Sequence, residues 1–396
     1  MKNTTWTKEC FAGLLRFSIA GLLAAALVLP ANAGSLEQAK RLHDRLAGVP
    51  PSEAVLNQMK DAIDAGDTRG AADLAMANKN FYNVTLKNFA APWTNRDGSV
   101  FVPMNDYIAT VIGMIRDDKP FNTVLSADIA YIGAPGTVTA SPAANNNTHF
   151  EQLEANNIDL SDTDLFVETT QSSIQGIPSA ATAGVITSRA ASEAFFVAGT
   201  NRAMFRFTLM NHMCNDMEQV HDPKLAPDRI RQDVSRSPGG DSRLFLNNCV
   251  GCHTGMDPMA QAFAYYNYNE TTGALEYTPG NVQPKYFNND LNFPQGFRTP
   301  DDRWDNYWRK GQNSYLGFDP NLPGSGNGPK SLGEELGNSA EFAKCQVKKV
   351  FRNVCLRDPE NPADRSKVDD IVNTFRSTQY KMKQVFADAA VYCMGS

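Results

Sequence analysis

The sequence has few histidines, no surplus of positive charge and no long hydrophobic run beyond its first 33 residues. Its 396 residues include 5 histidines, 37 lysines and arginines, and 43 aspartates and glutamates, for a net charge of −6. Such an acidic chain lacks the basic footprint of a nucleic-acid-binding protein and is a poor match for anionic lipid. Because no later segment is apolar enough to span a bilayer, we expect no membrane span in the mature chain.

Residues 1–33 have the pattern of a secretory signal peptide. Lys2, Lys8 and Arg16 precede the apolar run FSIAGLLAAALVLP, and the small-residue triplet ANA follows it. A basic start, a short apolar run and such an exit are typical of a cleaved export signal. A retained anchor is the alternative, but the run is shorter than the roughly 20 residues that cross a bilayer. Cleavage would leave a periplasmic or secreted chain with a net charge of about −8.

Helical patterns dominate the chain after the signal. The run YIATVIGMIRDD, for example, places its apolar positions 108, 111, 112 and 115 on one helical face. Residues 264–330 are instead rich in aromatic residues and Asn and are interrupted by Gly and Pro, which indicates ordered loops with short strands. The sequence therefore predicts a mainly α, multi-helical fold with an aromatic-rich loop region and little β structure.

The same patterns divide the mature chain into four segments. We expect an N-terminal helical domain at 34–135, an irregular connection with a helical lead-in at 136–200, a region bearing a cysteine pair at 201–337, and a C-terminal helical unit at 338–396. Within the third segment, DSRLFLNNCVGCH is expected to be one helix, capped by Asp241 and ending at or just after the cysteines. The following Asp257-Pro258 is expected to be a turn and a helix stop.

The stretch NNCVGCHTGMDP carries the most specific signal. Cys249, Cys252 and His253 form a Cys-x-x-Cys-His motif, which is the signature of c-type haem attachment. Two thiols can form thioether bonds to the haem vinyl groups, and the adjacent imidazole can bind the iron as the proximal ligand. The spacing places both sulfurs on the same side of a helical turn. The sequence therefore predicts one covalently bound haem c and, around it, a cytochrome c-like haem unit.

The cysteine pair has two other possible uses, a redox-active disulfide and a zinc site. A redox-active pair is expected at the start of a helix in a βαβ setting, and no such pattern surrounds these residues. A zinc site needs further ligands, for which Cys214 and His212 are available. Adjacent Cys252 and His253 are a poor arrangement for one tetrahedral ion. The motif therefore favours haem attachment over these two alternatives.

The distal iron ligand is left open by the sequence. No Met or His occurs between Met259 and Met382, so the aromatic segment can wall a haem but cannot supply a sulfur or an imidazole. An open or water-bound iron is one alternative. The others are an upstream cluster and the C-terminal methionines, comprising Met210, His212, Met213, Met217, His221, Met382 and Met394.

The remaining cysteines and histidines have simpler expected roles. Cys345 and Cys355 lie on one predicted helix, where ten residues separate their Cα atoms by about 15 Å, beyond the disulfide limit of about 7 Å. We therefore expect disulfides between Cys355 and Cys393 and between Cys214 and Cys345, although spacing alone does not determine connectivity. His43 and His149 are expected to be solvated.

Several stretches resemble the planctomycete-type cytochrome c domain families, which are domains of unknown function in secreted bacterial proteins. These are LHDRLAGVPPSE, AGVITSRAASEAFFVAGTNRAMFRFTLMNHMC, CVGCHTGMDPMAQAFAYYNYNETTGAL, FAKCQVKKVFRNVCLRDP and VDDIVNTFRSTQYKMKQVFADAAVY. The resemblance covers most of the mature chain and implies a haem protein with Cys249, Cys252 and His253 as its haem ligands. It implies no particular reaction. The run MAQAF after Asp-Pro departs from the family, which has a Gly there.

Three functions follow from one haem on an exported helical protein. The first is single-electron transfer with a redox partner protein, which needs no further catalytic group. The second is a haem enzyme, peroxidase- or oxygenase-like, which needs an open iron site with polar groups above it. The third is a structural or interaction protein of an envelope assembly, in which haem staples a large helical domain. Electron transfer is the favoured function, and an enzyme is the less favoured one.

Overall fold

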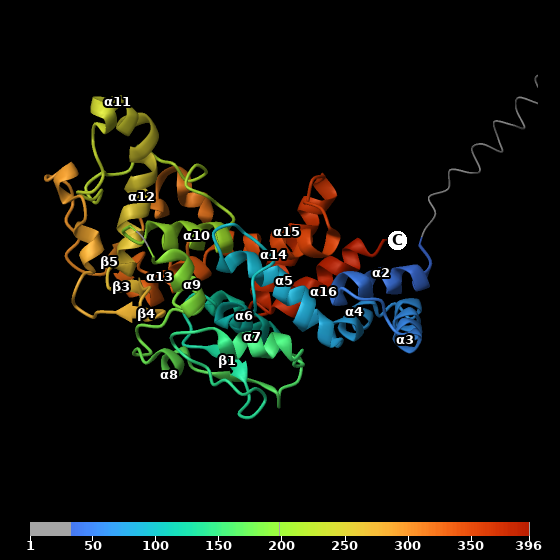
Figure 1. Cartoon of the computed structure of the whole chain (residues 1–396). Helices are drawn as coiled ribbons and strands as arrows, with labels where there is room; N and C mark the ends of the chain where they lie inside the picture. The colour runs from blue at the N-terminus through green and yellow to red at the C-terminus, as the bar shows by residue number, and fades with distance from the viewer. Residues whose placement is uncertain (1–32, 198, 396) are drawn as a thin grey trace, which may run out of the picture.

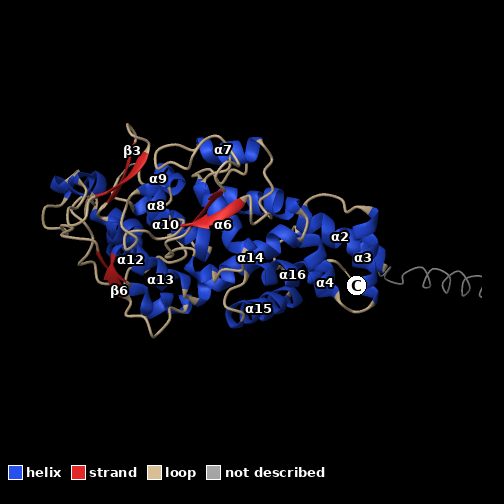
Figure 2. Cartoon of the chain, turned by 90° about the horizontal axis from the view of Figure 1, so that it is seen from below, coloured by secondary structure: helices blue, strands red, loops and turns tan. Residues whose placement is uncertain are grey.

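A computed structural model describes residues 33–197 and 199–395. The predicted signal peptide, apart from its last residue, lies outside the described residues. Helices make up 54% of the structure and strands 7%, so the prediction of a mainly α fold is confirmed. Figure 2 shows the helices filling most of the molecule, with short strands between them.

The helices follow the chain in this order: α2 (Ser35–Ala47), α3 (Glu53–Asp64), α4 (Thr68–Met76), α5 (Lys87–Ala90), α6 (Asp106–Arg116), α7 (Thr148–Ala155), α8 (Gln171–Gln175), α9 (Arg189–Phe195), α10 (Arg202–Met213), α11 (Ser242–Leu244), α12 (Val250–Ala260), α13 (Gly328–Gly337), α14 (Ala340–Cys355), α15 (Pro362–Ser377) and α16 (Met382–Cys393). Two π-helical segments, η1 (Phe81–Leu86) and η5 (Phe245–Cys249), lead into α5 and α12. Several single 3₁₀ turns complete the helical structure.

The strands form three separate antiparallel pairs in the described residues. They are β1 (Ala130–Gly133) with β2 (Phe166–Thr169), β3 (Tyr266–Asn269) with β4 (Ala274–Tyr277), and β5 (Arg303–Asp305) with β6 (Ser325–Asn327). Each strand has only three or four residues. Two-stranded ribbons of this length are not stable alone, so packing against the helices must hold them.

The N-terminal and C-terminal helices pack together at one end of the molecule. In Figure 1, α2–α4 lie beside α14 and α16, whereas α11, α12 and the β3–β5 region lie at the opposite end. Arg41 and Arg45 of α2 donate hydrogen bonds to the carbonyls of Met394 and Cys393, at 2.6 and 3.1 Å. Cations at the C-terminal end of a helix satisfy carbonyls that have no partner within that helix.

One hydrophobic core runs through all four predicted segments, from Ala39 in α2 to Met394 after α16. Helix α6 lies inside it, in contact with α5, α9, α16 and β1. Every residue from Tyr107 to Ile115 is buried, and the helix is therefore enclosed on all sides and not only on its apolar face. All four segments contribute to this core. Their boundaries therefore mark changes in the sequence pattern and not separate hydrophobic cores.

Two expectations about histidines were wrong. His43 and His149 are buried, with 1% and 3% of their surface exposed, and not solvated. Each ring is satisfied locally: Nδ1 of His43 pairs with the carbonyl of Val49 and Nδ1 of His149 with the carbonyl of Ala140, both at 2.8 Å. Hydrogen bonds to backbone groups remove much of the cost of burying an imidazole.

Among the described residues, no helix combines the length and the apolar character that crossing a bilayer requires.

Candidate haem site

The Cys-x-x-Cys-His motif lies in the middle of a long helical segment. Asp241 caps its start by accepting a hydrogen bond from the backbone N–H of Arg243, as predicted. The chain then passes through α11 and the π-helical η5, which ends at Cys249, and continues as α12 to Ala260. Two expectations are therefore wrong: the helix does not end at or just after the cysteines, and Asp257-Pro258 does not stop it, because Pro258 lies inside α12.

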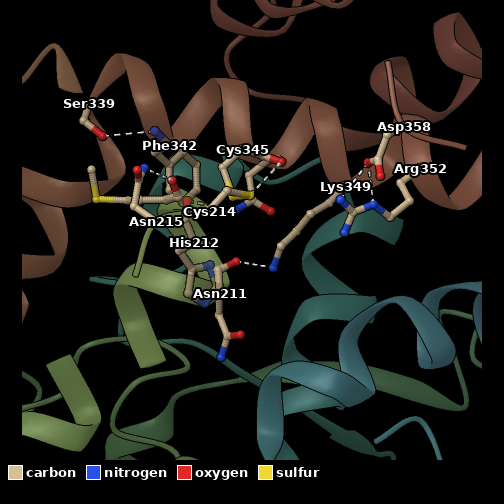
Figure 3. Close-up of a disulfide and its surroundings, with 12 residues drawn as sticks. Asn211, His212, Cys214, Asn215, Ser339, Phe342, Cys345, Lys349, Arg352 and Asp358 are labelled. Carbon is tan, nitrogen blue, oxygen red and sulfur yellow. Dashed lines mark hydrogen bonds and ion pairs between the residues drawn. A yellow bond between two sulfur atoms is a disulfide. The ribbon is translucent and has the colours of Figure 1, made fainter. Parts of the chain in front are cut away.

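The four other described cysteines form two disulfides. Cys214 pairs with Cys345, with their Cα atoms 5.3 Å apart, and Cys355 pairs with Cys393, with their Cα atoms 5.4 Å apart. This is the predicted connectivity, and both Cys345 and Cys355 lie on α14 as expected. Figure 3 shows the first disulfide joining the end of α10 to α14. Cys249 and Cys252 thus remain as thiols, and both are partly exposed.

A hydrogen bond to Asp257 fixes the orientation of the His253 ring. Nδ1 of His253 lies 3.1 and 3.2 Å from the two carboxylate oxygens of Asp257, one helical turn further along α12. A carboxylate only accepts hydrogen bonds, so Nδ1 must carry the proton. The neutral ring then has its lone pair on Nε2. Metal-binding histidines are commonly oriented in this way, with the second ring nitrogen donating to a carboxylate.

Asp257 is itself held in a buried network of charges. Its side chain is fully buried, and both of its oxygens accept hydrogen bonds from Arg202, at 2.6 and 2.9 Å. Arg202 also binds Asp233 through two hydrogen bonds of 2.6 and 2.9 Å. The buried Arg231 lies 3.8 Å from Asp257 and donates its backbone N–H to the same carboxylate. The network attaches α12 to α10 and to the loop before α11.

This network keeps Asp257 ionised. Burial acts to raise the pKa of Asp257, but the positive charges of Arg202 and Arg231 and the hydrogen bond from His253 outweigh it. The pKa of this carboxyl therefore lies well below its usual range. An ionised carboxylate is a stronger hydrogen-bond acceptor than a neutral one. It therefore makes the opposite nitrogen of His253 a better electron donor to a metal.

The other face of α12 packs into the protein through two glycines. A Cβ atom at Gly251 would overlap the ring of His221, and one at Gly255 would overlap the indole of Trp308. Gly251 lies two residues before His253, which is about 200° around an α-helix. The Gly251 face is therefore turned away from His253, and this close packing leaves the His253 face of α12 free of these bulky partners.

The structure places most of the distal-ligand candidates away from His253. Nε2 of His212 forms a 2.6 Å hydrogen bond with the hydroxyl of Tyr107 in the core, and burial holds the His212 pKa well below its usual value. His221 packs against Gly251, on the face of α12 turned away from His253. Met213, Met217, Met382 and Met394 all belong to the buried core, and Figures 1 and 2 both show α16, with Met382, well away from α12.

Two of the candidates remain closer to the motif or to solvent. The backbone carbonyl of Met217 accepts a hydrogen bond from the thiol of Cys252 at 3.6 Å, so the backbone of Met217 lies directly beside the motif. Met210 is partly exposed and lines a pocket between α10 and α14. Met217 and His221 are therefore the two candidates that the structure places against the motif, Met217 through its backbone carbonyl and His221 through its packing on Gly251.

The residues around the motif fit a thioether-linked haem. Cys249 packs against a small apolar cluster, separate from the main core, that includes Phe245 and Val250. Leu246, with 57% of its surface exposed, lies about one turn before Cys249. Burial raises the pKa of the Cys252 thiol, and the nearby charge of Glu218 raises it further. The donor set is thus two free thiols beside apolar surface and one imidazole with an oriented Nε2.

The structure also bears on the two other uses of the cysteine pair. A zinc site built with Cys214 and His212 is excluded, because the first is in a disulfide and the second binds Tyr107. In the described ranges, the motif included, no group of three or more His, Cys, Asp or Glu side chains is placed to hold a metal ion. The thiols also lie within a continuous helical segment and not at its start, unlike a redox-active pair in a βαβ unit.

Sequence reasoning missed Asp257, Arg202 and Arg231. A signal for Asp257 was available, since residues four apart on a helix are neighbours and His253 and Asp257 have that spacing. The prediction of a helix stop at Asp257-Pro258 concealed it. The two arginines come from segments 26 and 55 residues away from Asp257 in the chain, and no local pattern connects them to it.

No family model, curated protein or solved structure matches this chain.

Proposed function

We propose that this protein is an exported c-type cytochrome that carries one haem c and transfers single electrons to or from a redox partner protein. The observation that carries the proposal is the pairing of an intact Cys-x-x-Cys-His motif with the orientation of His253. Two of the described cysteines are left outside disulfides, and both belong to the motif. The resemblance to planctomycete-type cytochrome c domains is in line with the proposal.

Cys249 and Cys252 would attach the cofactor covalently. Each thiol adds its sulfur to one carbon of a vinyl double bond and its hydrogen to the other, so that one C–S bond forms without net oxidation or reduction. Their spacing of three residues places both sulfurs on a similar side of the helical segment. The pattern of the export signal and the two disulfides support assembly in an oxidising compartment such as the periplasm.

His253 would supply the proximal iron ligand through Nε2. Asp257 holds the proton on Nδ1, and Arg202 and Arg231 hold Asp257 in its charged form. This chain of contacts orients the ring before any iron is bound, so little conformational entropy is lost on binding. The bound haem supplies one-electron redox chemistry, and the protein tunes it through the axial ligand and the hydrogen bonds behind that ligand.

A haem enzyme with an open iron site is the second candidate function. It is favoured by the engagement of His212 with Tyr107 and by the burial of Met213 and Met382 in the core. With these candidates committed elsewhere, Met217 and His221 are the ones beside the motif, and His221 lies on the face of α12 turned away from His253. A six-coordinate cytochrome needs a ligand on the distal face, whereas an oxygenase or peroxidase needs that position free.

An absorption spectrum of the reduced protein, recorded with and without carbon monoxide, tests the proposal. Material must come from a bacterium that matures c-type cytochromes. Electron transfer predicts a six-coordinate spectrum that carbon monoxide leaves unaltered, and reversible reduction. A spectrum that shifts on adding the gas would favour the enzyme. The variant in which both motif cysteines become Ser is the control, and its haem must be lost under denaturing conditions.

A further inference from the structure

A hollow in the surface, the pocket that Met210 lines, lies between the end of α10 and the helices α14 and α15. Its cavity volume is about 680 Å³, which is large enough for a small organic molecule. The chain segment 214–219 forms one wall, and α14 and α15 form the others. The same segment contacts the haem motif, because the carbonyl of Met217 lies 3.6 Å from the sulfur of Cys252. None of the three motif residues lines this hollow, which we call the α14–α15 pocket.

The base of the α14–α15 pocket is partly apolar and is fixed in place. Met210 from α10 and Val368 from α15 line it, together with Cys214 of the disulfide to Cys345. Lys349 joins the two sides by donating a hydrogen bond to the carbonyl of Asn211 near the end of α10 (Figure 3). The disulfide and this hydrogen bond both join α14 to the end of α10. They hold two walls of the pocket in place, so the pocket is largely pre-formed.

The rim of the pocket carries positive charge that lies outside the ion pairs of the described residues, although the carboxylate of Glu341, three residues before Lys344 on α14, interacts with Lys344 and Lys348. Lys344 and Lys348 lie four residues apart on α14, and Arg365 projects from α15. None of these three belongs to an ion pair among the described residues, although Arg365 donates a hydrogen bond to the carbonyl of Glu360. In a chain with a net charge of −6, this is a local reversal of sign.

Acidic residues in the same lining do not cancel this charge. Asp216 is paired with Arg206, which lies outside the lining, and Asp358 is paired with Arg352 at 2.6 Å. Asp369 is the remaining carboxylate of the lining. Burial lowers the pKa of Lys349, the fourth lining cation without an ion pair in the described ranges, well below its usual range. The other three cations exceed Asp369 and the neighbouring Glu341, so the rim attracts a negative ligand.

We infer that the α14–α15 pocket binds a small organic carboxylate whose apolar part lies against Met210, Val368 and the disulfide, and whose carboxylate is held by Lys344 and Lys348. An inorganic anion would use the rim but leave the apolar base uncovered. A neutral apolar molecule would cover the base but leave the lysines unpaired. The combination of an apolar base with a few convergent charged groups is typical of a ligand site.

Isothermal titration of the purified mature protein with octanoate tests this inference. Saturable one-to-one binding is expected, with no binding of octanol and weaker binding of inorganic phosphate. The double variant K344E/K348E is expected to weaken octanoate binding at least about tenfold, because both cations of the rim become anions. The matched charge-change control, K224E/K310E, alters two exposed lysines outside the pocket and is expected to leave binding unchanged.

Three results would overturn the inference: no saturable heat with octanoate, equal binding of phosphate, or equal binding by K344E/K348E. The milder variant K344Q/K348Q serves if the charge reversal impairs folding, which the melting curve of each variant reveals. The test needs no haem. A colourless protein that binds octanoate would contradict the proposed function but would support the octanoate site.

Discussion

Replacing Asp257 by Asn gives the sharpest test of the buried network behind His253. Asn keeps the shape of the side chain and one acceptor oxygen, but it removes the negative charge that Arg202 and Arg231 share. Removing one partner of a buried ion pair costs roughly 3–5 kcal/mol, because the remaining charge stays buried without compensation. Arg202 retains Asp233 through two hydrogen bonds. We therefore expect the lower end of that range, about 3 kcal/mol.

The loss is measured as the free energy of unfolding in urea at neutral pH, monitored by circular dichroism. Asp233→Asn is the matched control, because Asp233 also binds Arg202 but makes no contact with His253. Asp233 is partly exposed, and Arg202 keeps its ion pair with Asp257 when Asp233 is replaced. We therefore expect this variant to lose about 1 kcal/mol of stability. Equal destabilisation by the two variants would refute the claim that Asp257 contributes more to the stability of the network than Asp233 does.

The same pair of variants separates structural from electronic effects of Asp257. Loss of its charge makes His253 a weaker donor to a metal, so with the proposed haem bound the reduction potential of D257N should be higher than that of the wild type. Asp233→Asn should leave the potential nearer to the wild-type value. A potential that is unchanged in D257N, in protein that still carries haem, would refute the role assigned to Asp257.

Four further predictions concern other features of the structure. The hydrogen bonds from Arg357 lower the pKa of Asp364 to about 2, below its unfolded value near 3.8, so the stability this carboxylate contributes should be lost as pH falls from about 4 to about 2. Urea melts at pH 5 and pH 3 should therefore differ less for D364N than for the wild type, and an equal loss in both would contradict this. Gly255→Ala should destabilise the protein by about 1–3 kcal/mol, because the new methyl group meets the buried Trp308, whereas Ser242→Ala on the exposed start of the helix should cost far less. Removing the disulfide between α14 and α16, which spans 38 residues, should cost about 4 kcal/mol in the chain-entropy model. Peptide mapping without reduction should recover both predicted disulfide-linked pairs, and any other pairing would contradict the structure.

The helices and the disulfides were largely predictable because their causes are local or few. Ser52 caps α3 by accepting a hydrogen bond from the N–H of Val55, and its place before a helical run identifies it. Distance along α14 excluded a disulfide between Cys345 and Cys355, but two connectivities remained, and the expected pairing of Cys214 with Cys345 is confirmed only by the structure. The helix cap is thus decided by the local sequence, whereas the choice between the two connectivities depends on the fold.

The end of the motif helix was not predictable from Asp257-Pro258 alone. A proline inside a helix removes one hydrogen bond and crowds the preceding turn, so a helix stop is the usual expectation. Here tertiary contacts offset that cost: Asp257 is held by Arg202 and Arg231, and Gly255 packs against Trp308. These partners are distant in sequence. The helix therefore continues for reasons that only the folded structure contains.

Intact mass is the most direct measurement of the central claim, that haem is covalently attached through Cys249 and Cys252. Mature protein from a bacterium that matures c-type cytochromes should have the mass of the chain after signal cleavage plus one haem. The colour should survive acid–acetone extraction, because thioether bonds hold the porphyrin. Colourless protein with the mass of the bare chain would contradict the account.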